Sequence, residues 1–235
     1  MPVIQRSIVK VAEQLAKRGF EVRRHPAARR QKLFARHGVD LVIDVGAADG
    51  GYGRDLRTFG YAGRIESFEP LAAAYSRLEK NLDANWHAHH HALGAEEGEA
   101  VINVASNSNS SSLLPMLDAH REAAPQVDYV GQETIILKRL DDLDVLGAAR
   151  APFLKIDTQG FEKSVIEGGA ETIARCVGVQ LEISFVPLYD GGMLADEAIS
   201  WGYANGFRIA VIEQGYAAPT GEVLQMDAVF MREGS

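Results

Sequence analysis

The segment DLVIDVGAADGGYG, residues 40–53, places a largely apolar run directly before a glycine-rich turn. The run Leu41–Val45 is typical of a short buried strand. Gly46 and Gly50 let the chain turn sharply and let a ligand approach the backbone closely. A buried strand that runs into such a turn is typical of a parallel sheet, so the segment predicts an α/β fold.

The rest of the chain alternates between strand patterns and helix patterns. Further strands are predicted at residues 63–70, 86–94, 99–105, 133–138, 152–156, 177–184, 207–213 and 226–231. Helices are predicted at residues 3–18, 27–36, 71–85, 162–176 and 196–205, with a break at Gly168 and Gly169. This alternation predicts a doubly wound, mainly parallel sheet with helices on both faces. Only a loop joins the last two strands, so they should form an antiparallel hairpin, and the strands around the Ser/Asn-rich loop are extra to the sheet.

Composition and charge exclude several classes of protein. At 235 residues the chain fits one large domain, and its formal net charge of −8 argues against a nucleic-acid partner. No apolar run is long enough for a transmembrane helix, and the first residues lack the apolar core of a secretory signal. The single cysteine, Cys176, cannot form an internal disulfide and is expected in the core. The cytoplasm is therefore the expected location.

Positive charge is concentrated at the N-terminus. Only Glu13 and Glu21 oppose the basic residues before Asp40, which are Arg6, Lys10, Lys17, Arg18, Arg23, Arg24, Arg29, Arg30, Lys32 and Arg36. We interpret residues 1–38 as a helical extension whose charged face is solvated and packs on the acidic body. A surface for an anionic substrate or a membrane interface is the alternative. The same extension is a candidate cap for the active site or a homodimer contact.

Carboxylates end several predicted strands, at the edge where parallel sheets bind ligands. The glycine turn lacks the spacing G-x-G-x-x-G, and Asp49 would repel a pyrophosphate, so a nicotinamide cofactor is disfavoured. Asp44 suits an ammonium group, and Glu69, at the end of the second strand, suits two ribose hydroxyls. Together they fit S-adenosylmethionine. The alternative is a structural role, as a turn carboxylate for Asp44 and a solvated strand end for Glu69.

Several blocks occur in an order that resembles FkbM-type S-adenosylmethionine-dependent methyltransferases. They are IDVGAADG, FEP, HALG, SNSSSLL, KRLDDL, LKIDTQGFEKSVIEGG, QLEISFVPLY and MDAVFMR, and they span Asp40 to Arg232. LKIDTQGFE is the most specific of them. The resemblance implies a class I methyltransferase (Rossmann-like) fold with a seven-stranded sheet over residues 39–235. It also implies methylation of a hydroxyl on a sugar, a glycan or a small natural product.

The resemblance further assigns cofactor-binding residues. It places Asp44, Gly46 and Gly50 at the methionine end of S-adenosylmethionine, Glu69 at the ribose, and Ala92 and Leu93 near the adenine. Ala47 and Pro70, next to these residues, are also predicted to bind the cofactor. The family commonly has Asn where this chain has Ala48, so one polar contact near the cofactor is missing.

Asp157 and Glu182 are the candidate catalytic residues. They lie at or near the ends of two strands predicted to be neighbours, so their carboxylates should lie side by side. An alcohol is a poor nucleophile near neutral pH, which favours a general base, Asp157, with Glu182 positioning the acceptor. A second interpretation is a metal pair that holds Mg²⁺, similar to metal-dependent O-methyltransferases. The third is structural, with Asp157 as a helix cap and Glu182 in an ion pair.

Other polar residues have weaker assignments. Ser111 and Ser112, with Ser110, are candidates to line the acceptor site, and Tyr189 to stack on a sugar face; a surface loop and simple packing are the alternatives. Alternation along a strand sends His87, His89 and His91 to one face and His90 to the other, which favours structural roles over a metal cluster. Lys155 is expected to pair with an acidic neighbour.

The sequence therefore predicts an O-methyltransferase that uses S-adenosylmethionine, with Mg²⁺ as an open question and a small molecule or glycan as acceptor. A protein of a different class is the alternative. A degenerate methyltransferase fold would bind the cofactor and act as a partner or sensor.

Overall fold

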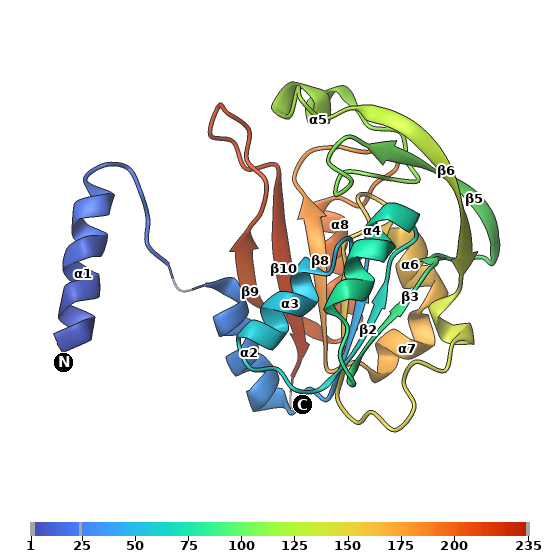
Figure 1. Cartoon of the computed structure of the whole chain (residues 1–235), viewed down its shortest axis with the longest axis horizontal. Helices are drawn as coiled ribbons and strands as arrows, with labels where there is room; N and C mark the ends of the chain where they lie inside the picture. The colour runs from blue at the N-terminus through green and yellow to red at the C-terminus, as the bar shows by residue number, and fades with distance from the viewer. Residues whose placement is uncertain (1–2, 24, 234–235) are drawn as a thin grey trace.

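The structure, a computed structural model, describes residues 3–23 and 25–233. A mainly parallel sheet with the strand order β3-β2-β1-β7-β8-β10-β9 forms its centre (Figure 1). The strands are β1 Leu41–Val45, β2 Arg64–Phe68, β3 Trp86–His89, β7 Pro152–Ile156, β8 Gly178–Ser184, β9 Phe207–Gln214 and β10 Gln225–Arg232. β10 is antiparallel to β8 and β9, and the other pairs are parallel. The predicted doubly wound sheet with its terminal hairpin is confirmed.

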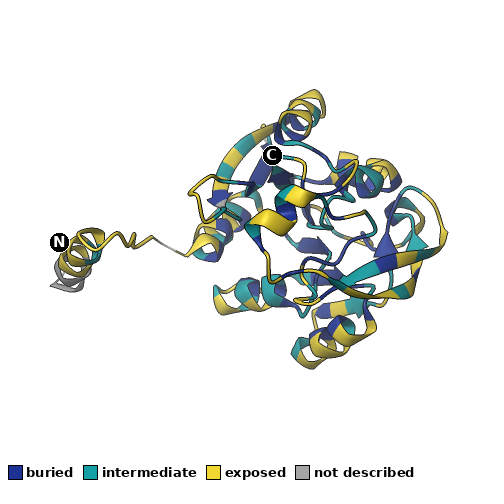
Figure 2. Ribbon diagram, turned by 90° about the horizontal axis from the view of Figure 1, so that it is seen from above, coloured by how far each residue is buried: buried dark blue, intermediate teal, exposed yellow. Residues whose placement is uncertain are grey.

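Helices cover both faces of this sheet. One face carries α2 Pro26–His37, α3 Gly51–Thr58 and α4 Ala72–Leu78, and the other carries α6 Glu162–Gly168, α7 Ala170–Arg175 and α8 Ala195–Ala204. The alternation of side chains along β1 explains the two layers. Val42 packs in one core with Phe34 of α2, whereas Ile43 packs in the other with Val165 of α6. Figure 2 shows the buried segments gathered in the middle of the body.

The sequence prediction missed α3 and gave two other elements with the wrong extent. The run 86–94 is not one strand, because β2, the partner of β3, ends at Phe68; after His89 the chain bends and continues as β4 Ala92–Leu93 in a second sheet. That sheet has the order β4-β6-β5, with β5 Gly98–Ala105 and β6 Tyr129–Lys138. The helix predicted at 71–85 ends at Leu78 and continues as a 3-10 turn, Glu79–Asn81.

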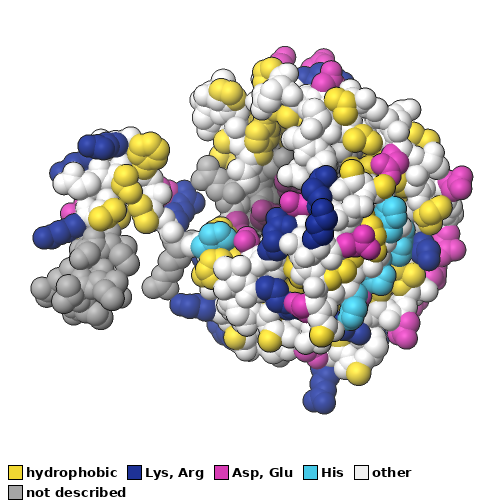
Figure 3. Space-filling view, viewed as in Figure 1, with side chains coloured by type: hydrophobic (Ala, Val, Ile, Leu, Met, Phe, Trp, Pro, Cys, Tyr) yellow, Lys and Arg dark blue, Asp and Glu magenta, His cyan; other side chains and the backbone are white. Residues whose placement is uncertain are grey.

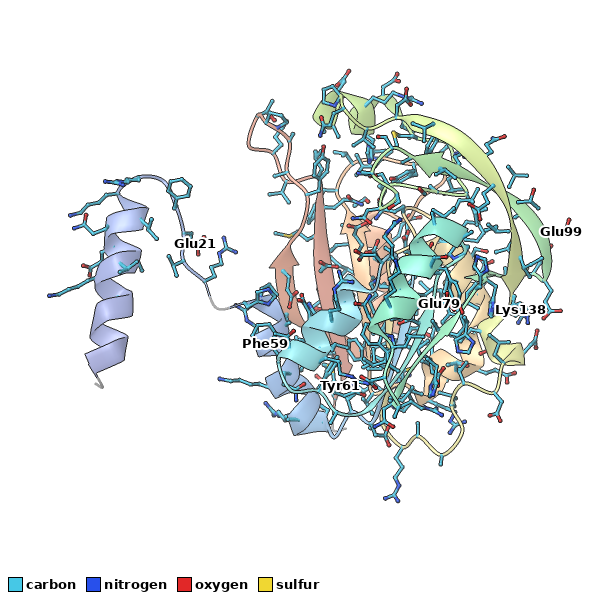
Figure 4. All side chains as sticks on the ribbon, in the orientation of Figure 1. Glu21, Phe59, Tyr61, Glu79, Glu99 and Lys138 are labelled. Atoms are coloured by element: carbon cyan, nitrogen blue, oxygen red, sulfur yellow. The ribbon has the colours of Figure 1, made fainter. Side chains whose placement is uncertain are left out.

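The second sheet curves over one side of the body, and Glu99 of β5 projects from its outer edge (Figures 1 and 4). The chain between β5 and β6 carries a short helix that the sequence did not predict, α5 Asp118–Ala123. A second 3-10 turn, Leu140–Asp142, follows β6.

The N-terminal segment divides into two parts. Helix α1, Val3–Ala16, stands apart from the body in Figure 1, with Val9 and Val11 49% and 57% exposed. The interpretation that its charged face packs on the body is therefore wrong for α1. In α2, by contrast, Arg30 and Phe34 are buried, and Phe59 and Tyr61, labelled in Figure 4, lie beside this helix. Arg24 lies outside the described residues, and no described helix is long and apolar enough to cross a membrane.

Candidate active site

A cavity of about 590 Å³ lies beyond the carboxyl ends of the parallel strands β1, β2, β7 and β8. The strand order changes direction at β1, between β2 and β7, which is where open α/β sheets bind ligands. Its volume falls in the range of small-molecule sites. The glycine turn, the end of β2, the β5–β6 insertion and β10 all contribute to its walls.

The turn after β1 approaches β7 too closely for any side chain at Gly46. Gly46 has a φ of 75°, and a Cβ placed there would lie 1.8 Å from the carbonyl oxygen of Asp157. The backbone N–H groups of Gly46 and Ala47 both donate to the carbonyl of Phe68, at 3.0 Å. Gly46 and Ala47 line the cavity. Gly50, with a φ of 85°, caps α3 and is not among the lining residues.

Asp44 is fully buried below this turn and pairs with Lys155. The Lys155 Nζ atom lies 3.0 Å from Asp44 Oδ1, 2.9 Å from the Gly46 carbonyl oxygen and 3.6 Å from Asp157 Oδ2. Burial opposes the charge of Lys155, but the two carboxylates outweigh burial and raise its pKa. The expectation that Lys155 has an acidic partner is confirmed. The expected contact between Asp44 and a ligand ammonium is not available here, because Asp44 does not line the cavity and Lys155 neutralises it.

Glu69 lies at the end of β2 and lines the cavity with 5% of its surface exposed. Its Oε2 accepts a hydrogen bond from Ala48 N at 2.8 Å, and its Oε1 accepts one from Leu71 N at 2.9 Å. Burial raises the pKa of Glu69 from 4.5 to about 7, although both hydrogen bonds act in the opposite direction. The contribution of Glu69 to stability is therefore fully present below pH 4.5 and is lost as the pH rises through about 7.

Ala48 adopts a left-handed backbone conformation, with a φ of 49°. Asn and Gly adopt this conformation more readily than Ala does. The backbone of this position therefore suits the Asn that the FkbM-type pattern commonly carries there.

An apolar wall borders the cavity next to Glu69. Pro70, Ala92 and Leu93 line it, and Ala92 and Leu93 are both buried. The two residues form β4, so the bend after β3 is what brings them to the cavity. A flat apolar ring would fit against such a wall.

Asp157 and Glu182 both line the cavity, from neighbouring parallel strands. The side-chain amide of Gln159 joins them: its Nε2 donates to Asp157 Oδ1 at 2.8 Å and to Glu182 Oε2 at 2.7 Å. Gln225 Nε2 also donates to Glu182 Oε2, at 2.9 Å. Burial and then the charge of Asp157 raise the pKa of Glu182 well above its ordinary value.

The predicted acceptor residues separate into two groups. Ser110 and Ser111 line the cavity, but Ser112 does not, because its hydroxyl donates to the Gln159 carbonyl oxygen at 2.6 Å. Tyr189 is 3% exposed and its hydroxyl donates to Gln159 Oε1 at 2.9 Å. The prediction that Tyr189 stacks on the acceptor is therefore wrong. Its ring is packed in the core of the insertion, and its hydroxyl holds Gln159.

None of the four histidines of the run 86–94, which are His87, His89, His90 and His91, lines the cavity. Figure 3 shows a stripe of histidine side chains on the surface of the body. Glu66 Oε1 lies 3.2 Å from His87 Nδ1, and Glu66 Oε2 lies 2.7 Å from His89 Nε2. His90 faces the other way and stacks on Tyr75 at 4.5 Å. Within the described part of the chain, no group of three or more His, Cys, Asp or Glu side chains is placed to hold a metal ion.

The sequence interpretation missed several residues that line the cavity. Arg30 of α2 is 6% exposed, forms an ion pair with Glu213 at 2.7 Å and lies 4.5 Å over the ring of Tyr52. The charged-face interpretation is therefore wrong for Arg30. Gln159 stands inside the block LKIDTQGFE, so its position offered a signal. His120 offered none, because α5 follows no recognisable pattern.

Comparison with known proteins identifies the chain. The methyltransferase FkbM domain family matches residues 44–209. The chain belongs to this family. No curated protein matches in sequence. Two solved structures share the fold of this FkbM methyltransferase, each with a TM-score of 0.50.

The first solved structure is magnesium protoporphyrin IX methyltransferase from Synechocystis PCC 6803 with bound SAM. It is 10% identical, and the match covers 99% of this chain and 85% of that one. The second is a putative S-adenosylmethionine-dependent methyltransferase from Listeria monocytogenes. It is 8% identical, and the match covers 88% and 98% of the two chains. The family makes this chain a methyltransferase, and the two solved structures show that it shares their fold.

Proposed function

We propose that this FkbM methyltransferase methylates a hydroxyl group of a sugar, a glycan or a small natural product. The observation that carries the proposal is the shared cavity. One part of its lining is the glycine turn with Glu69, and another is the joined carboxyl groups of Asp157 and Glu182. Groups that suit a methyl donor and groups that suit an acceptor hydroxyl therefore line one cavity.

The glycine turn, Glu69 and the wall beside it fit S-adenosylmethionine, which supplies an electrophilic methyl group when bound. Because Gly46 has no side chain, the methionine end of the cofactor can approach its backbone closely. The buried carboxylate of Glu69, once ionised, would accept hydrogen bonds from two ribose hydroxyls. The wall of Pro70, Ala92 and Leu93 would take the adenine. We assign no direct contact to Asp44, whose charge Lys155 already neutralises.

In the pair of joined carboxyl groups, we assign Asp157 as the general base that takes the proton of the acceptor hydroxyl. Gln159 fixes the orientation of the Asp157 carboxylate through its amide. Glu182, with its raised pKa, is placed to orient the acceptor. Among the described residues, Lys155 Nζ lies 3.6 Å from Asp157 Oδ2 and is the nearest cation to the proposed base.

The base assignment agrees with the local geometry better than the two alternatives. A helix cap is not needed from Asp157, because Glu162 Oε1 accepts from Thr158 N and Gly160 N at 3.0 and 3.1 Å. Among the described residues, Glu182 has no ion-pair partner. The Gln159 amide bridges the two carboxyl groups, where a Mg²⁺ ion held by the pair would have to lie. We therefore propose the base role for this pair.

Asp157→Asn should lower kcat/KM by about 100- to 10,000-fold, because that is the usual contribution of a general base. The measurement is transfer of a labelled methyl group from S-adenosylmethionine to a panel of sugars, polyols and hydroxylated natural products. The affinity for S-adenosylhomocysteine should stay within about twofold, since the variant keeps the size of the side chain.

Glu182→Gln is the matched comparison and should reduce turnover less than Asp157→Asn. A loss below tenfold for Asp157→Asn would contradict the base role. Loss of turnover after chelation, with recovery on Mg²⁺, would favour the metal pair instead. Cofactor binding without turnover on any acceptor would favour the partner or sensor function.

The buried thiol of Cys176 suits a reducing compartment, so we keep the cytoplasm as the proposed location.

A further inference from the structure

We propose that His120 and Tyr216 form an acceptor subsite that binds a second hydroxyl group of a polyhydroxylated ring such as a sugar. The inference rests on the proposed function, because it assigns a place to the part of the acceptor that is not methylated. Both side chains line the cavity, and both carry a buried polar atom that makes no hydrogen bond to any described residue. The two atoms are His120 Nδ1 and the Tyr216 hydroxyl oxygen.

His120 belongs to helix α5 of the β5–β6 insertion and is 4% exposed. Its ring packs edge-on against Tyr189, with 5.4 Å between the ring centroids, so its orientation is fixed. Burial lowers the pKa of His120 below its ordinary value, so the imidazole is neutral near pH 7. A neutral imidazole has one nitrogen that donates and one that accepts, which suits a hydroxyl group.

Tyr216 lies between β9 and β10, on a different part of the chain. Its carbonyl oxygen accepts hydrogen bonds from Leu224 N at 2.9 Å and Gln225 N at 3.1 Å, so its backbone is held in place. The ring centroids of Tyr216 and His120 are 6.2 Å apart. Two segments that are remote in sequence thus bring two unpaired polar atoms to the same wall of the cavity.

The subsite is connected to the proposed base. Tyr189, which packs against His120, donates to Gln159 Oε1 at 2.9 Å, and Gln159 Nε2 donates to Asp157 Oδ1 at 2.8 Å. One rigid network therefore sets the position of the subsite relative to Asp157. An acceptor that spans both needs at least two hydroxyl groups, one to be methylated and one to be held.

Burying a polar atom without a partner costs stability, so a protein gains by replacing it unless a ligand uses it. An apolar acceptor would leave both atoms unpaired, whereas a polyhydroxylated ring would pair them. The chemical class that fits the wall best is therefore a polyhydroxylated ring.

Tyr216→Phe and Tyr129→Phe form a matched pair that tests the subsite. The Tyr129 hydroxyl donates to the Leu114 carbonyl oxygen at 2.8 Å and is not part of the cavity lining. Tyr129→Phe should therefore lower the melting temperature, and Tyr216→Phe should leave it unchanged or raise it. His120→Phe, which keeps a ring against Tyr189, is the second variant at the subsite.

Binding is measured by saturation-transfer NMR with the methyl α-glycosides of glucose, galactose, mannose and rhamnose, in the presence of saturating S-adenosylhomocysteine. We expect at least one glycoside to bind the unmodified enzyme and the Tyr129→Phe variant equally. Tyr216→Phe and His120→Phe should each weaken the binding of that glycoside by about tenfold, which corresponds to the loss of one hydrogen bond. Calorimetry should show unchanged affinity for S-adenosylhomocysteine in all three variants.

A melting temperature that falls as far in Tyr216→Phe as in Tyr129→Phe would overturn the subsite, because the hydroxyl would then have a partner in the free protein. Binding of no glycoside by an enzyme that binds S-adenosylhomocysteine would show that the acceptor class is wrong. If S-adenosylhomocysteine itself does not bind, the proposed function fails first, and the subsite with it.

Discussion

Lys155→Met is expected to lower the free energy of unfolding by about 3–5 kcal/mol, the usual cost of removing one partner of a buried ion pair. Asp44 is fully buried, and the Lys155 Nζ atom 3.0 Å away is the cation that neutralises it. Without this cation the Asp44 carboxyl must either ionise in an apolar core or take up a proton. Urea denaturation at pH 7 measures the change.

Two controls separate this effect from the loss of a lysine in general. Lys163 pairs with Glu197 at the same distance, 3.0 Å, but both side chains are more than 40% exposed, at 43% and 46%. Lys163→Met should therefore cost less than about 1 kcal/mol. The double variant Asp44→Asn with Lys155→Met should recover part of the lost stability, because it buries no unpaired charge. Equal losses in Lys155→Met and Lys163→Met would contradict the buried pair.

Gly46→Ala is expected to lower stability by about 2–5 kcal/mol, as the sum of left-handed strain and overpacking. The added methyl group would lie 1.8 Å from the Asp157 carbonyl oxygen, so the turn and the end of β7 must move apart. That movement displaces both the cofactor turn and the proposed base. The affinity for S-adenosylhomocysteine should fall at least about tenfold, or 1.4 kcal/mol, as calorimetry can measure.

Gly191→Ala isolates the backbone strain from the collision. Gly191 has a φ of 76°, almost that of Gly46, but nothing lies within 4 Å of a Cβ placed on it. Gly191→Ala should therefore lower the free energy of unfolding only by the strain cost of about 1–2 kcal/mol. The variant should keep its affinity for S-adenosylhomocysteine. If the two alanine variants lose the same stability and the same affinity for S-adenosylhomocysteine, the close approach of the turn to β7 does not contribute to cofactor binding.

The sequence predicted the main sheet well, because buried strands and amphipathic helices have strong periodic signals. The run Leu41–Val45 and the break at Gly168 are examples. The prediction from sequence failed where the end of one strand depends on the length of the neighbouring strand. The pattern 86–94 continues through His90, but β2 offers no partner beyond Phe68, so the chain leaves the sheet. Helix α5 has too few residues for a period to show.

The candidate site was predictable where side chains follow strands. Glu69, Asp157 and Glu182 all line the cavity because parallel strands end at the same edge. The spacing of residues along the sequence gave no information on which side chains contact one another. The ion pair of Lys155 with Asp44 and the position of Tyr189 in the core depend on contacts between distant segments. His120 enters the cavity from an insertion and Arg30 from the N-terminal segment, and neither lies at a strand end.

The most direct test of the methyltransferase site is calorimetric titration of S-adenosylhomocysteine into the protein and its Glu69→Gln variant, with NAD as the control ligand. We expect a Kd in the micromolar range for the unmodified protein and no binding of NAD. The affinity should rise between pH 6 and pH 8, since Glu69, with a pKa raised to about 7, accepts ribose hydrogen bonds best when ionised. Glu69→Gln should bind at least about tenfold more weakly and lose this pH dependence. Equal binding by both proteins, or binding of NAD in place of S-adenosylhomocysteine, would contradict the assignment of this cavity.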